Sequence, residues 1–213
     1  YNPAETPTAD TNANSGQANE TSNESGENDT QALEAPAKNP FLDVNADSYY
    51  YEAVLWAVEN EITQGTSETT FNPEEVVTRA QMVTFIWRAA GRPEPETSEL
   101  PFTDVDENAY YYKAVLWAAE NGITLGTSAT TFSPDETVTR AQAVTFLFRT
   151  LGIRTEADNP FIDVQKEDYF YEAVLWAVDH GITKGTGIAM FSPNDSCLRA
   201  QIVTFLYRAY HQD

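Results

Sequence analysis

The chain has 213 residues and a formal net charge of −21, with 12 basic against 33 acidic residues. This charge argues against nucleic acid as a partner, because phosphate binding depends on clustered lysine and arginine. No stretch approaches the roughly 20 apolar residues that a membrane-spanning helix needs, so we expect no membrane insertion. Cys197 is the only cysteine, which excludes an internal disulfide, and we expect it to be a small buried side chain.

Residues 1–39 are rich in Thr, Asn, Ser, Glu, Ala and Pro, and Leu33 is their only aliphatic residue beyond alanine. Such a composition cannot bury enough apolar surface to offset the entropy lost on ordering, so we predict a disordered acidic linker. The sequence shows no initiator methionine and no signal-peptide pattern. We therefore expect the linker to have followed another module, covalently fused on its N-terminal side.

The rest of the chain repeats one pattern three times, opening with F-x-D-V at Phe41, Phe102 and Phe161, about 60 residues apart. In a repeat architecture one unit cannot bury its apolar face alone, so neighbouring copies must pack together. We assign repeat 1 to residues 40–98, repeat 2 to 99–157 and repeat 3 to 158–213. Any site built from repeat residues is therefore expected up to three times.

The first helix of each repeat is predicted at residues 49–60, 110–121 and 169–180, where Ala, Leu, Trp and Glu occur without an interior Gly or Pro. Polar residues precede each helix and are placed to cap its start. These candidate caps are Asp47, Ser48, Asn108 and Asp168.

Glycine follows the first helix in two repeats, at Gly122 and Gly181, each before an isoleucine. This pattern predicts a left-handed residue that ends the helix. Repeat 1 has Glu61 at the same place, which should cost about 1 kcal/mol if φ is positive there.

The second helix of each repeat is predicted to begin at T-R-A-Q, or L-R-A-Q in repeat 3. Thr78 with Gln81, and Thr139 with Gln142, fit a capping box, in which the two residues satisfy each other's backbone N–H groups. Leu198 replaces the threonine in repeat 3, so that helix should start less stably by about 1 kcal/mol.

The second helix is apolar nearly all round, apart from a stripe that in repeat 1 comprises Gln81, Thr84 and Arg88. Such a helix is typically buried on most sides. We therefore predict an all-α fold of three helix-loop-helix repeats, with the second helices forming a common core of pseudo-threefold character. The phenylalanines of the intervening loops are expected to fill this core: Phe71, Phe132 and Phe191.

The arginine of T-R-A-Q lies in the first helical turn, where the helix dipole disfavours a cation. It is roughly 160 to 200° around the helix from the polar stripe, so it should point toward its own loop or a neighbouring repeat. One interpretation is an ion pair with the aspartate of F-x-D-V. The other is a guanidinium presented in a groove between repeats, where it can clamp a carboxylate. The sequence leaves both open for the pairs Arg79 and Asp43, Arg140 and Asp104, and Arg199 and Asp163.

In fixed order, F-x-D-V, Y-Y-Y-x-A-V-L-W-A, G-I-T-x-G-T, T-F-x-P and T-R-A-Q resemble the S-layer homology domain family, from Phe41 to about Tyr210. The resemblance implies a three-repeat unit that non-covalently holds extracellular bacterial proteins on the cell wall. Its partner would be secondary cell wall polysaccharide, often through a pyruvylated amino sugar, or a peptidoglycan-linked glycan. In this family the glycan binds grooves between repeats and the motif arginine contacts it.

Carried onto this chain, the resemblance gives a set of candidate glycan-binding residues. These are Arg79, Arg140, Arg199, Gln81, Gln142, Gln201, Gly122, Gly181, Trp56, Trp117 and Trp176. The tryptophans lie inside aliphatic helical runs, so packing in the core is an alternative role for them. The carboxylate of Glu61 would repel an anionic ligand at close range, so a groove that uses its loop should bind less well.

Other functions fit parts of the sequence. An enzyme is disfavoured because His180 and His211 give no frame for a catalytic triad. Asp43, Asn45 and Asp47 resemble the opening of a calcium-binding loop, but the required Gly and Glu are missing further on. We expect no metal and no cofactor. A structural S-layer or protein-interaction module without direct glycan binding is the remaining alternative.

Overall fold

The computed structural model describes residues 39–212, so all of the predicted linker at 1–39 except Asn39 lies outside the described residues. The described part forms six α-helices and no β-strand, which confirms the all-α prediction. None of these helices is both long and apolar enough to cross a membrane. In chain order the helices are α1 Tyr51–Glu59, α2 Arg79–Ala89, α3 Tyr112–Glu120, α4 Arg140–Leu151, α5 Tyr171–Asp179 and α6 Arg199–Tyr210.

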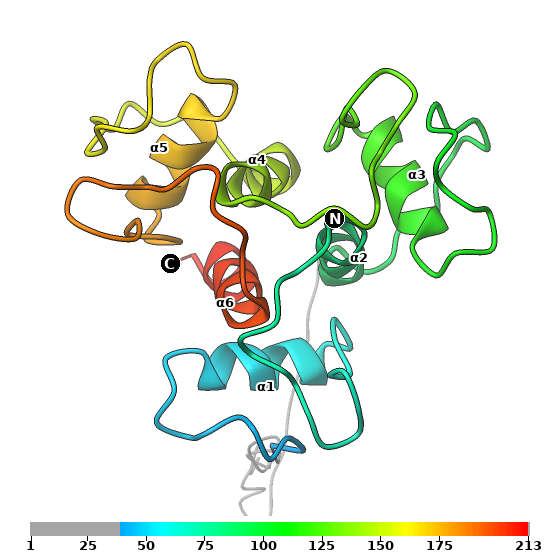
Figure 1. The fold of residues 1–213 in the computed structure, drawn as a ribbon, viewed down its shortest axis with the longest axis horizontal. Helices are drawn as coiled ribbons and strands as arrows, with labels where there is room; N and C mark the ends of the chain where they lie inside the picture. The colour runs from blue at the N-terminus through cyan, green and yellow to red at the C-terminus, as the bar shows by residue number, and fades with distance from the viewer. Residues whose placement is uncertain (1–38, 213) are drawn as a thin grey trace, which may run out of the picture. The chain divides into compact units, whose positions relative to one another are not determined.

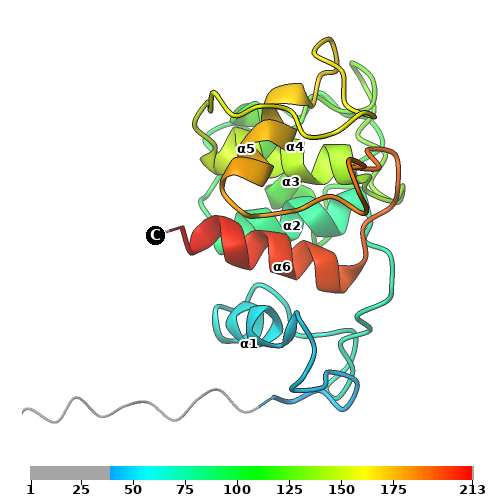
Figure 2. The same ribbon diagram turned by 90° about the vertical axis from the view of Figure 1, so that its left-hand side faces the viewer.

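The second helices of the repeats, α2, α4 and α6, lie together at the centre, and the first helices, α1, α3 and α5, surround them (Figure 1). Each outer helix packs mainly on the central helix of the preceding repeat: α3 on α2, α5 on α4, and α1 on α6. Figure 2 shows α6 from the side and α1 nearly end-on, so the outer and central helices cross steeply. The predicted pseudo-threefold bundle is confirmed, and its ring closes between the first and last repeats.

Three backbone hydrogen bonds join one residue of each repeat in a closed ring. The N–H of Val77 donates to the C=O of Cys197, Cys197 to Val138, and Val138 to Val77, at 2.9, 3.1 and 2.8 Å. All three side chains are fully buried, as the sequence predicts for Cys197. The loop phenylalanines are fully buried as well: Phe71, Phe132 and Phe191.

Each central helix depends on the next repeat to complete its first turn. The first N–H groups of a helix have no partner within the helix itself. In α2 the N–H of Arg79 donates to the C=O of Glu136 at 2.8 Å, and the N–H of Ala80 to that of Pro134 at 3.0 Å. Equivalent bonds start α4 on the loop of repeat 3 and α6 on the loop of repeat 1. The predicted capping boxes are also formed, at Thr78 with Gln81 and at Thr139 with Gln142.

The predicted side-chain caps of the first helices are wrong. The N-cap residues of α1, α3 and α5 make no side-chain capping bond. Instead the polar segment before each helix folds into a turn: the Oδ1 of Asn45 accepts from the N–H of Asp47, and the C=O of Ser48 accepts from the N–H of Tyr51. The polar residues are therefore used inside the turn, and the first helix starts later than predicted. The residues concerned are Asp47, Ser48, Asn108 and Asp168.

The C-terminal ends of the first helices follow the prediction. Gly122 and Gly181 have φ of +66° and +64°, and Glu61 has φ of +54°. After α1, the N–H of Glu61 donates to Val58 and the N–H of Ile62 to Ala57, at 2.9 and 2.7 Å. This is a Schellman ending, which turns the chain back across the helix and brings the following loop to the surface.

Candidate glycan-binding grooves

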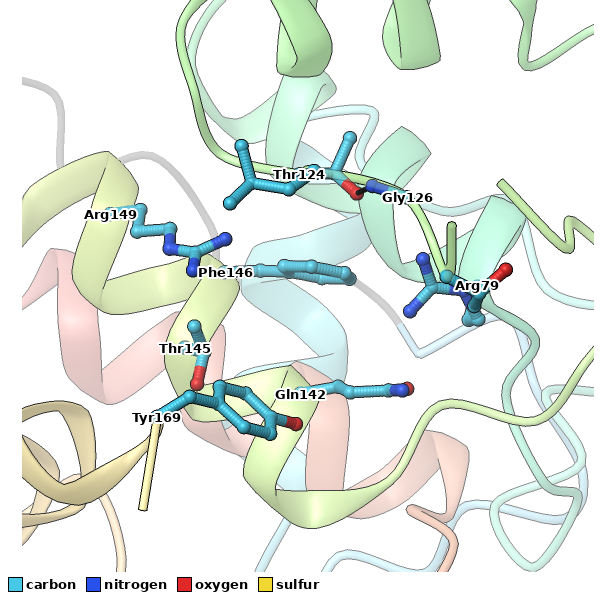
Figure 3. A pocket seen from close by; sticks show the side chains of 10 residues that line it. Arg79, Thr124, Gly126, Gln142, Thr145, Phe146, Arg149 and Tyr169 are labelled. Atoms are coloured by element: carbon cyan, nitrogen blue, oxygen red, sulfur yellow. Dashed lines mark hydrogen bonds between the residues drawn. The ribbon is translucent and has the colours of Figure 1, made fainter. Parts of the chain in front are cut away.

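One half-open pocket lies on the central helix of each repeat, and we number the three grooves after those repeats. Groove 1 includes Gln81, Thr84, Phe85, Arg88, Tyr110 and Arg199. Groove 2, shown in Figure 3, includes Gln142, Thr145, Phe146, Arg149, Tyr169 and Arg79. Groove 3 includes Gln201, Thr204, Phe205, Arg208, Tyr49 and Arg140. Loop residues 63–65, 124–127 and 183–185 complete the three linings, and the volumes are about 220, 390 and 220 Å³.

The T-R-A-Q arginine of each groove comes from the preceding repeat. In groove 2 the Nε of Arg79 donates to the C=O of Phe132 at 2.8 Å. Arg140 makes the same bond to Phe191, and Arg199 to Phe71. These arginines are only 2–3% exposed, yet each lines a groove. Each guanidinium is therefore fixed at the base of a groove by the loop of the next repeat.

The alternative of an ion pair with the F-x-D-V aspartate is wrong. The ion pairs among residues 39–212 do not include Arg79, Arg140 or Arg199. The carboxylate of Asp43 instead accepts from the N–H groups of Phe71 and Asn72, at 2.8 and 2.7 Å. Asp104 and Asp163 bind their own loops in the same way. The aspartate thus shapes its own loop, and a carbonyl oxygen of this loop accepts the hydrogen bond from the arginine of the preceding repeat.

Burial lowers the pKa of each of these guanidinium groups, and nearby acidic groups oppose this effect. Arginine stays charged at neutral pH even so. Part of the lost hydration is replaced by aromatic faces: the Cζ of Arg79 lies 4.9 Å from the ring centroid of Phe132 and 5.5 Å from that of Phe146. A buried cation without a carboxylate partner is costly, so the base of each groove is suited to an external anion.

A second arginine lies at the other end of each groove, at the C-terminal end of the central helix. In groove 2, Arg149 and Arg79 lie on opposite sides of the Phe146 ring (Figure 3). The Nη1 of Arg149 donates to the C=O of Ile123 at 3.1 Å, which fixes its guanidinium over the groove loop. Arg88 and Arg208 make the equivalent bonds. This arginine belongs to the polar stripe that the sequence shows on each second helix. The stripe indicated a polar helix face, but it did not identify the arginine as part of a binding site.

A tyrosine from the following repeat completes each groove and was missed by sequence reasoning. Tyr110, Tyr169 and Tyr49 line grooves 1, 2 and 3 and are 63–64% exposed. Each ring meets the next aromatic residue edge-on, as Tyr49 meets Tyr50 at a centroid distance of 5.0 Å. Every groove therefore takes side chains from all three repeats.

The other candidate residues fall into two groups. The glutamines Gln81, Gln142 and Gln201 line grooves 1, 2 and 3. The predicted tryptophans and glycines do not belong to these linings: Trp56, Trp117, Trp176, Gly122 and Gly181.

The tryptophans pack in or against the hydrophobic core instead, and the ring of Trp176 lies 5.8 Å from that of Phe148 in the preceding repeat. Trp117 and Trp176 are 9% and 3% exposed, and Trp56 is partly buried against Tyr207 and Tyr210 of α6. This agrees with the alternative role in the core.

The glycine that lines each groove is the one in G-I-T-x-G-T, at Gly65, Gly126 or Gly185. A Cβ added at Gly126 would lie 2.4 Å from the carbonyl oxygen of Thr131, so this loop has no room for a side chain. Glu61 does not line groove 1, and its carboxylate pairs with Arg92 at 3.0 Å.

The grooves carry charge of one sign only. No aspartate or glutamate occurs among the residues that line them, although the chain's formal net charge is −21. Within residues 39–212 there is also no group of three or more His, Cys, Asp or Glu side chains that could hold a metal ion. The arrangement can bind an anion beside an aromatic ring, with guanidinium groups at both ends.

Comparison with known proteins gives the same assignment as the motifs. The S-layer homology domain model matches residues 40–83, 101–144 and 160–203. The chain is 32% identical over 165 residues to a surface-layer 125 kDa protein of Lysinibacillus sphaericus, covering 75% of this chain and 14% of the relative. It is 30% identical over 177 residues to a cell surface protein of Thermoanaerobacter kivui, covering 81% of this chain and 21% of that protein.

An endoglucanase of Bacillus sp. (strain KSM-635) is 34% identical over 123 residues, which make up 57% of this chain and 13% of the enzyme. The chain thus spans less than a quarter of the length of these relatives. Because the family model matches all three repeats, the chain belongs to the S-layer homology domain family, as a cell-surface anchoring module of three tandem domains.

Proposed function

We propose that this module holds a surface protein on the bacterial cell wall by binding an acidic wall glycan, a pyruvylated secondary cell wall polysaccharide, in the grooves between its repeats. The observation that carries the proposal is that each groove presents two arginines and no acidic side chain, in a chain with a formal net charge of −21. Single-signed clefts of this kind concentrate ligands of the opposite charge.

In the proposed complex the pyruvate carboxylate meets the arginine at the base of the groove. A carboxylate accepts two parallel N–H bonds from one guanidinium, and such charge-assisted bonds are roughly twice as strong as neutral ones. In groove 2 this guanidinium belongs to Arg79, and Gln142 and Thr145 offer polar atoms for sugar hydroxyls. The exposed ring of Tyr169 provides an apolar face for the sugar.

Long-range repulsion between an acidic protein and an acidic polymer does not prevent this binding. The Debye length is about 8 Å at physiological ionic strength, so distant charges are largely screened. The guanidinium groups act inside the groove, at contact distance. Three grooves on one body also give multivalent attachment to a repeating polymer, so each groove can bind weakly while the anchor holds firmly.

We propose no catalytic step for this chain. General acid–base chemistry on a glycan requires two carboxyl groups in unlike environments, and the grooves are lined without any. The relatives are far longer than the segment that matches this chain. We therefore further propose that this chain is one part of a longer protein, and that the predicted linker joins the three repeats to the rest of that protein.

Binding to purified wall polysaccharide tests the proposal. The exposed tyrosines can be replaced without opening the core, so the triple variant Tyr49→Ala, Tyr110→Ala, Tyr169→Ala should stay folded and lose at least tenfold in affinity. A second triple variant replaces the arginines at the groove ends, Arg88, Arg149 and Arg208, by Gln, with the same expected loss.

The matched control is Arg154→Ala. Its side chain is 80% exposed and pairs with Glu172 outside the grooves, so the affinity should not change. Equal affinity of all four proteins would reject glycan binding in the grooves and favour the alternative of a structural or protein-interaction module.

A further inference from the structure

A further pocket lies outside the three grooves, beside the F-x-D-V turn of repeat 2. Its volume is about 350 Å³, and it shares no lining residue with any groove. The lining includes the carboxylates of Glu99 and Glu107 and the hydroxyl groups of Ser98 and Tyr112, but no lysine, arginine or histidine. This pocket therefore offers negative charge and hydrogen-bond acceptors, whereas the grooves offer cations.

An asparagine side chain closes the corresponding turn in the other two repeats. Asn39 and Asn159 lie two residues before the phenylalanine of F-x-D-V, and Leu100 holds this position in repeat 2. The Nδ2 of Asn39 donates to the C=O of Val44 at 2.8 Å, and Asn159 makes the equivalent bond, also at 2.8 Å. In repeat 2 the equivalent carbonyl, that of Val105, accepts no hydrogen bond from the described residues. Leu100 and Val105 both line the pocket, so the pocket lies where a protein N–H donor is missing.

The same turn also lacks a hydrogen-bond acceptor in repeat 2. The Oδ1 of Asn39 accepts from the N–H of Phe41 at 3.0 Å, and Asn159 does the same in repeat 3 at 2.9 Å. The N–H of Phe102 has no such partner among the described residues, and Phe102 also lines the pocket. The missing side chain thus leaves one backbone acceptor and one backbone donor to be satisfied from outside the chain.

A positive charge is missing from the turn of repeat 2 as well. Glu107 aligns with Lys166 in repeat 3 and with Ala46 in repeat 1, and Glu99 aligns with Asp158 in repeat 3. Repeat 3 therefore carries one acid and one base at two positions where repeat 2 carries two acids. Two carboxylates that line one pocket repel each other, and a cation bound between them turns this repulsion into attraction.

A ligand that fills this pocket needs three properties. It must donate a hydrogen bond to a carbonyl oxygen, accept one from a nearby N–H, and carry a positive charge. An ammonium group with a hydroxyl on the neighbouring carbon has all three, because the ammonium supplies three donors and the hydroxyl oxygen accepts. Its bonds to the carboxylates are charge-assisted and therefore stronger than neutral ones. The dipole at the start of α3, at Tyr112, opposes a cation only weakly at the protein surface.

We propose that this pocket is a second binding site, which takes an ammonium group with a hydroxyl on the neighbouring carbon, as in an amino sugar with a free amine. The ammonium lies between the carboxylates of Glu99 and Glu107 and donates to the C=O of Val105. The hydroxyl oxygen accepts from the N–H of Phe102. The site goes beyond the proposed function, because it binds a cation and uses none of the groove residues.

NMR titration of the intact chain with three small ligands tests the site. Methyl glucosaminide has a free amine beside a hydroxyl, its N-acetyl derivative lacks the charge, and ethanolamine carries the same two groups without a sugar ring. The amide signals of Phe102 and Glu107 report on the pocket, and the ring signals of Tyr169 report on groove 2. Methyl glucosaminide should shift both amide signals to saturation and leave Tyr169 unchanged. About tenfold more of the N-acetyl derivative should be needed, because it forms no charge-assisted bond.

Saturation at a lower concentration by methyl glucosaminide than by ethanolamine would assign the site to an amino sugar. The reverse order would assign it to an ethanolamine headgroup, and either order supports the ammonium site.

Substitutions that copy the other repeats should remove the binding. Glu107→Lys introduces the lysine of repeat 3 and should abolish the shift at Phe102. Leu100→Asn introduces the asparagine of repeats 1 and 3, whose amide competes for the same backbone groups, so about tenfold more ligand should be needed. Glu107→Gln should weaken binding by a similar factor. Its matched control is Glu68→Gln, which removes one exposed carboxylate outside the pocket and the grooves and should change nothing.

Three results would overturn this proposal: no saturable shift with either amine, equal affinity for methyl glucosaminide and its N-acetyl derivative, or unchanged binding in Glu107→Lys. Glu107→Lys should bind wall polysaccharide as the unchanged chain does, since Glu107 lines no groove. The ammonium site and glycan binding in the grooves can therefore fail independently of each other.

Discussion

The Nε of Arg199 donates to the carbonyl oxygen of Phe71 at 2.8 Å, although the two residues are 128 positions apart in the chain. This bond joins the last repeat to the first and also fixes the cation of groove 1. The same contact links Arg79 to Phe132 and Arg140 to Phe191. Closure of the ring and construction of the grooves therefore depend on the same three bonds.

Removing one repeat should disrupt all three grooves. A chain ending at residue 157 loses Arg199 from groove 1 and Tyr169 from groove 2, and keeps only Tyr49 and Arg140 of groove 3. It also leaves α1 without α6, its main packing partner. We expect this truncated chain to lose cooperative unfolding in urea, followed by tryptophan fluorescence and circular dichroism. The complete three-repeat unit should unfold in one transition by both probes, and a stable two-repeat fragment would contradict this account.

Substitutions at the N-cap residues of α2, α4 and α6 test how much capping contributes to stability. Thr78→Ala and Thr139→Ala should each lower the free energy of unfolding by about 1 kcal/mol, because the N–H of the N3 glutamine loses its acceptor. In repeat 3 only half of the box exists: the Oε1 of Gln201 accepts from the N–H of Leu198 at 3.1 Å. Leu198→Thr should add the missing half and stabilise the chain by a similar amount in chemical denaturation. A loss of stability in Leu198→Thr would mean that the leucine's packing outweighs the cap.

Glu61 offers a stabilising substitution. Its φ of +54° is strained for a residue with a Cβ, and its ion pair with Arg92 is exposed and contributes little. Glu61→Gly should therefore raise the free energy of unfolding by about 1 kcal/mol. Gly122→Glu, which copies repeat 1 into repeat 2, is the mirror experiment and should destabilise by about as much. If the free energy of unfolding rises in Glu61→Gly and falls in Gly122→Glu, the strain argument is supported. A change in the same direction in both variants would refute it.

The thiol of Cys197 gives a pH-dependent prediction. Burial raises its pKa from 9.0 to about 12, so the folded protein keeps the proton at a pH where the unfolded chain releases it. Stability should therefore fall as the pH rises from about 9 toward 12. Cys197→Val, which matches the equivalent Val77 and Val138, should weaken this dependence in denaturant titrations. Iodoacetamide at pH 8.5 should modify the thiol only at the rate of unfolding, and rapid alkylation of the folded chain would contradict its burial.

Much of the fold could be predicted from the sequence because its signals are local. The capping boxes need only residues three apart, and the left-handed helix ends need only a glycine or its substitute. The burial of Phe71 and Cys197 follows from their places in the repeat. The caps of the first helices were mispredicted because turns in the backbone use the same polar residues that can cap a helix.

The grooves were only partly predictable, because their geometry is cyclic. The sequence singled out Arg79 because a cation is unusual in the first turn of a helix. It did not indicate that the carbonyl oxygen of Phe132 would accept the hydrogen bond from Arg79. Tyr169 looked like the start of a helix in its own repeat, and its role in groove 2 depends on a packing order that no local pattern encodes.

The most direct test of the central claim is to measure the affinity of the intact chain for native wall polysaccharide and for the same polymer after chemical removal of its pyruvate. The account predicts at least a tenfold loss of affinity on depyruvylation, because the grooves would lose the carboxylate that their arginines bind. Equal affinity for the two polymers would contradict it.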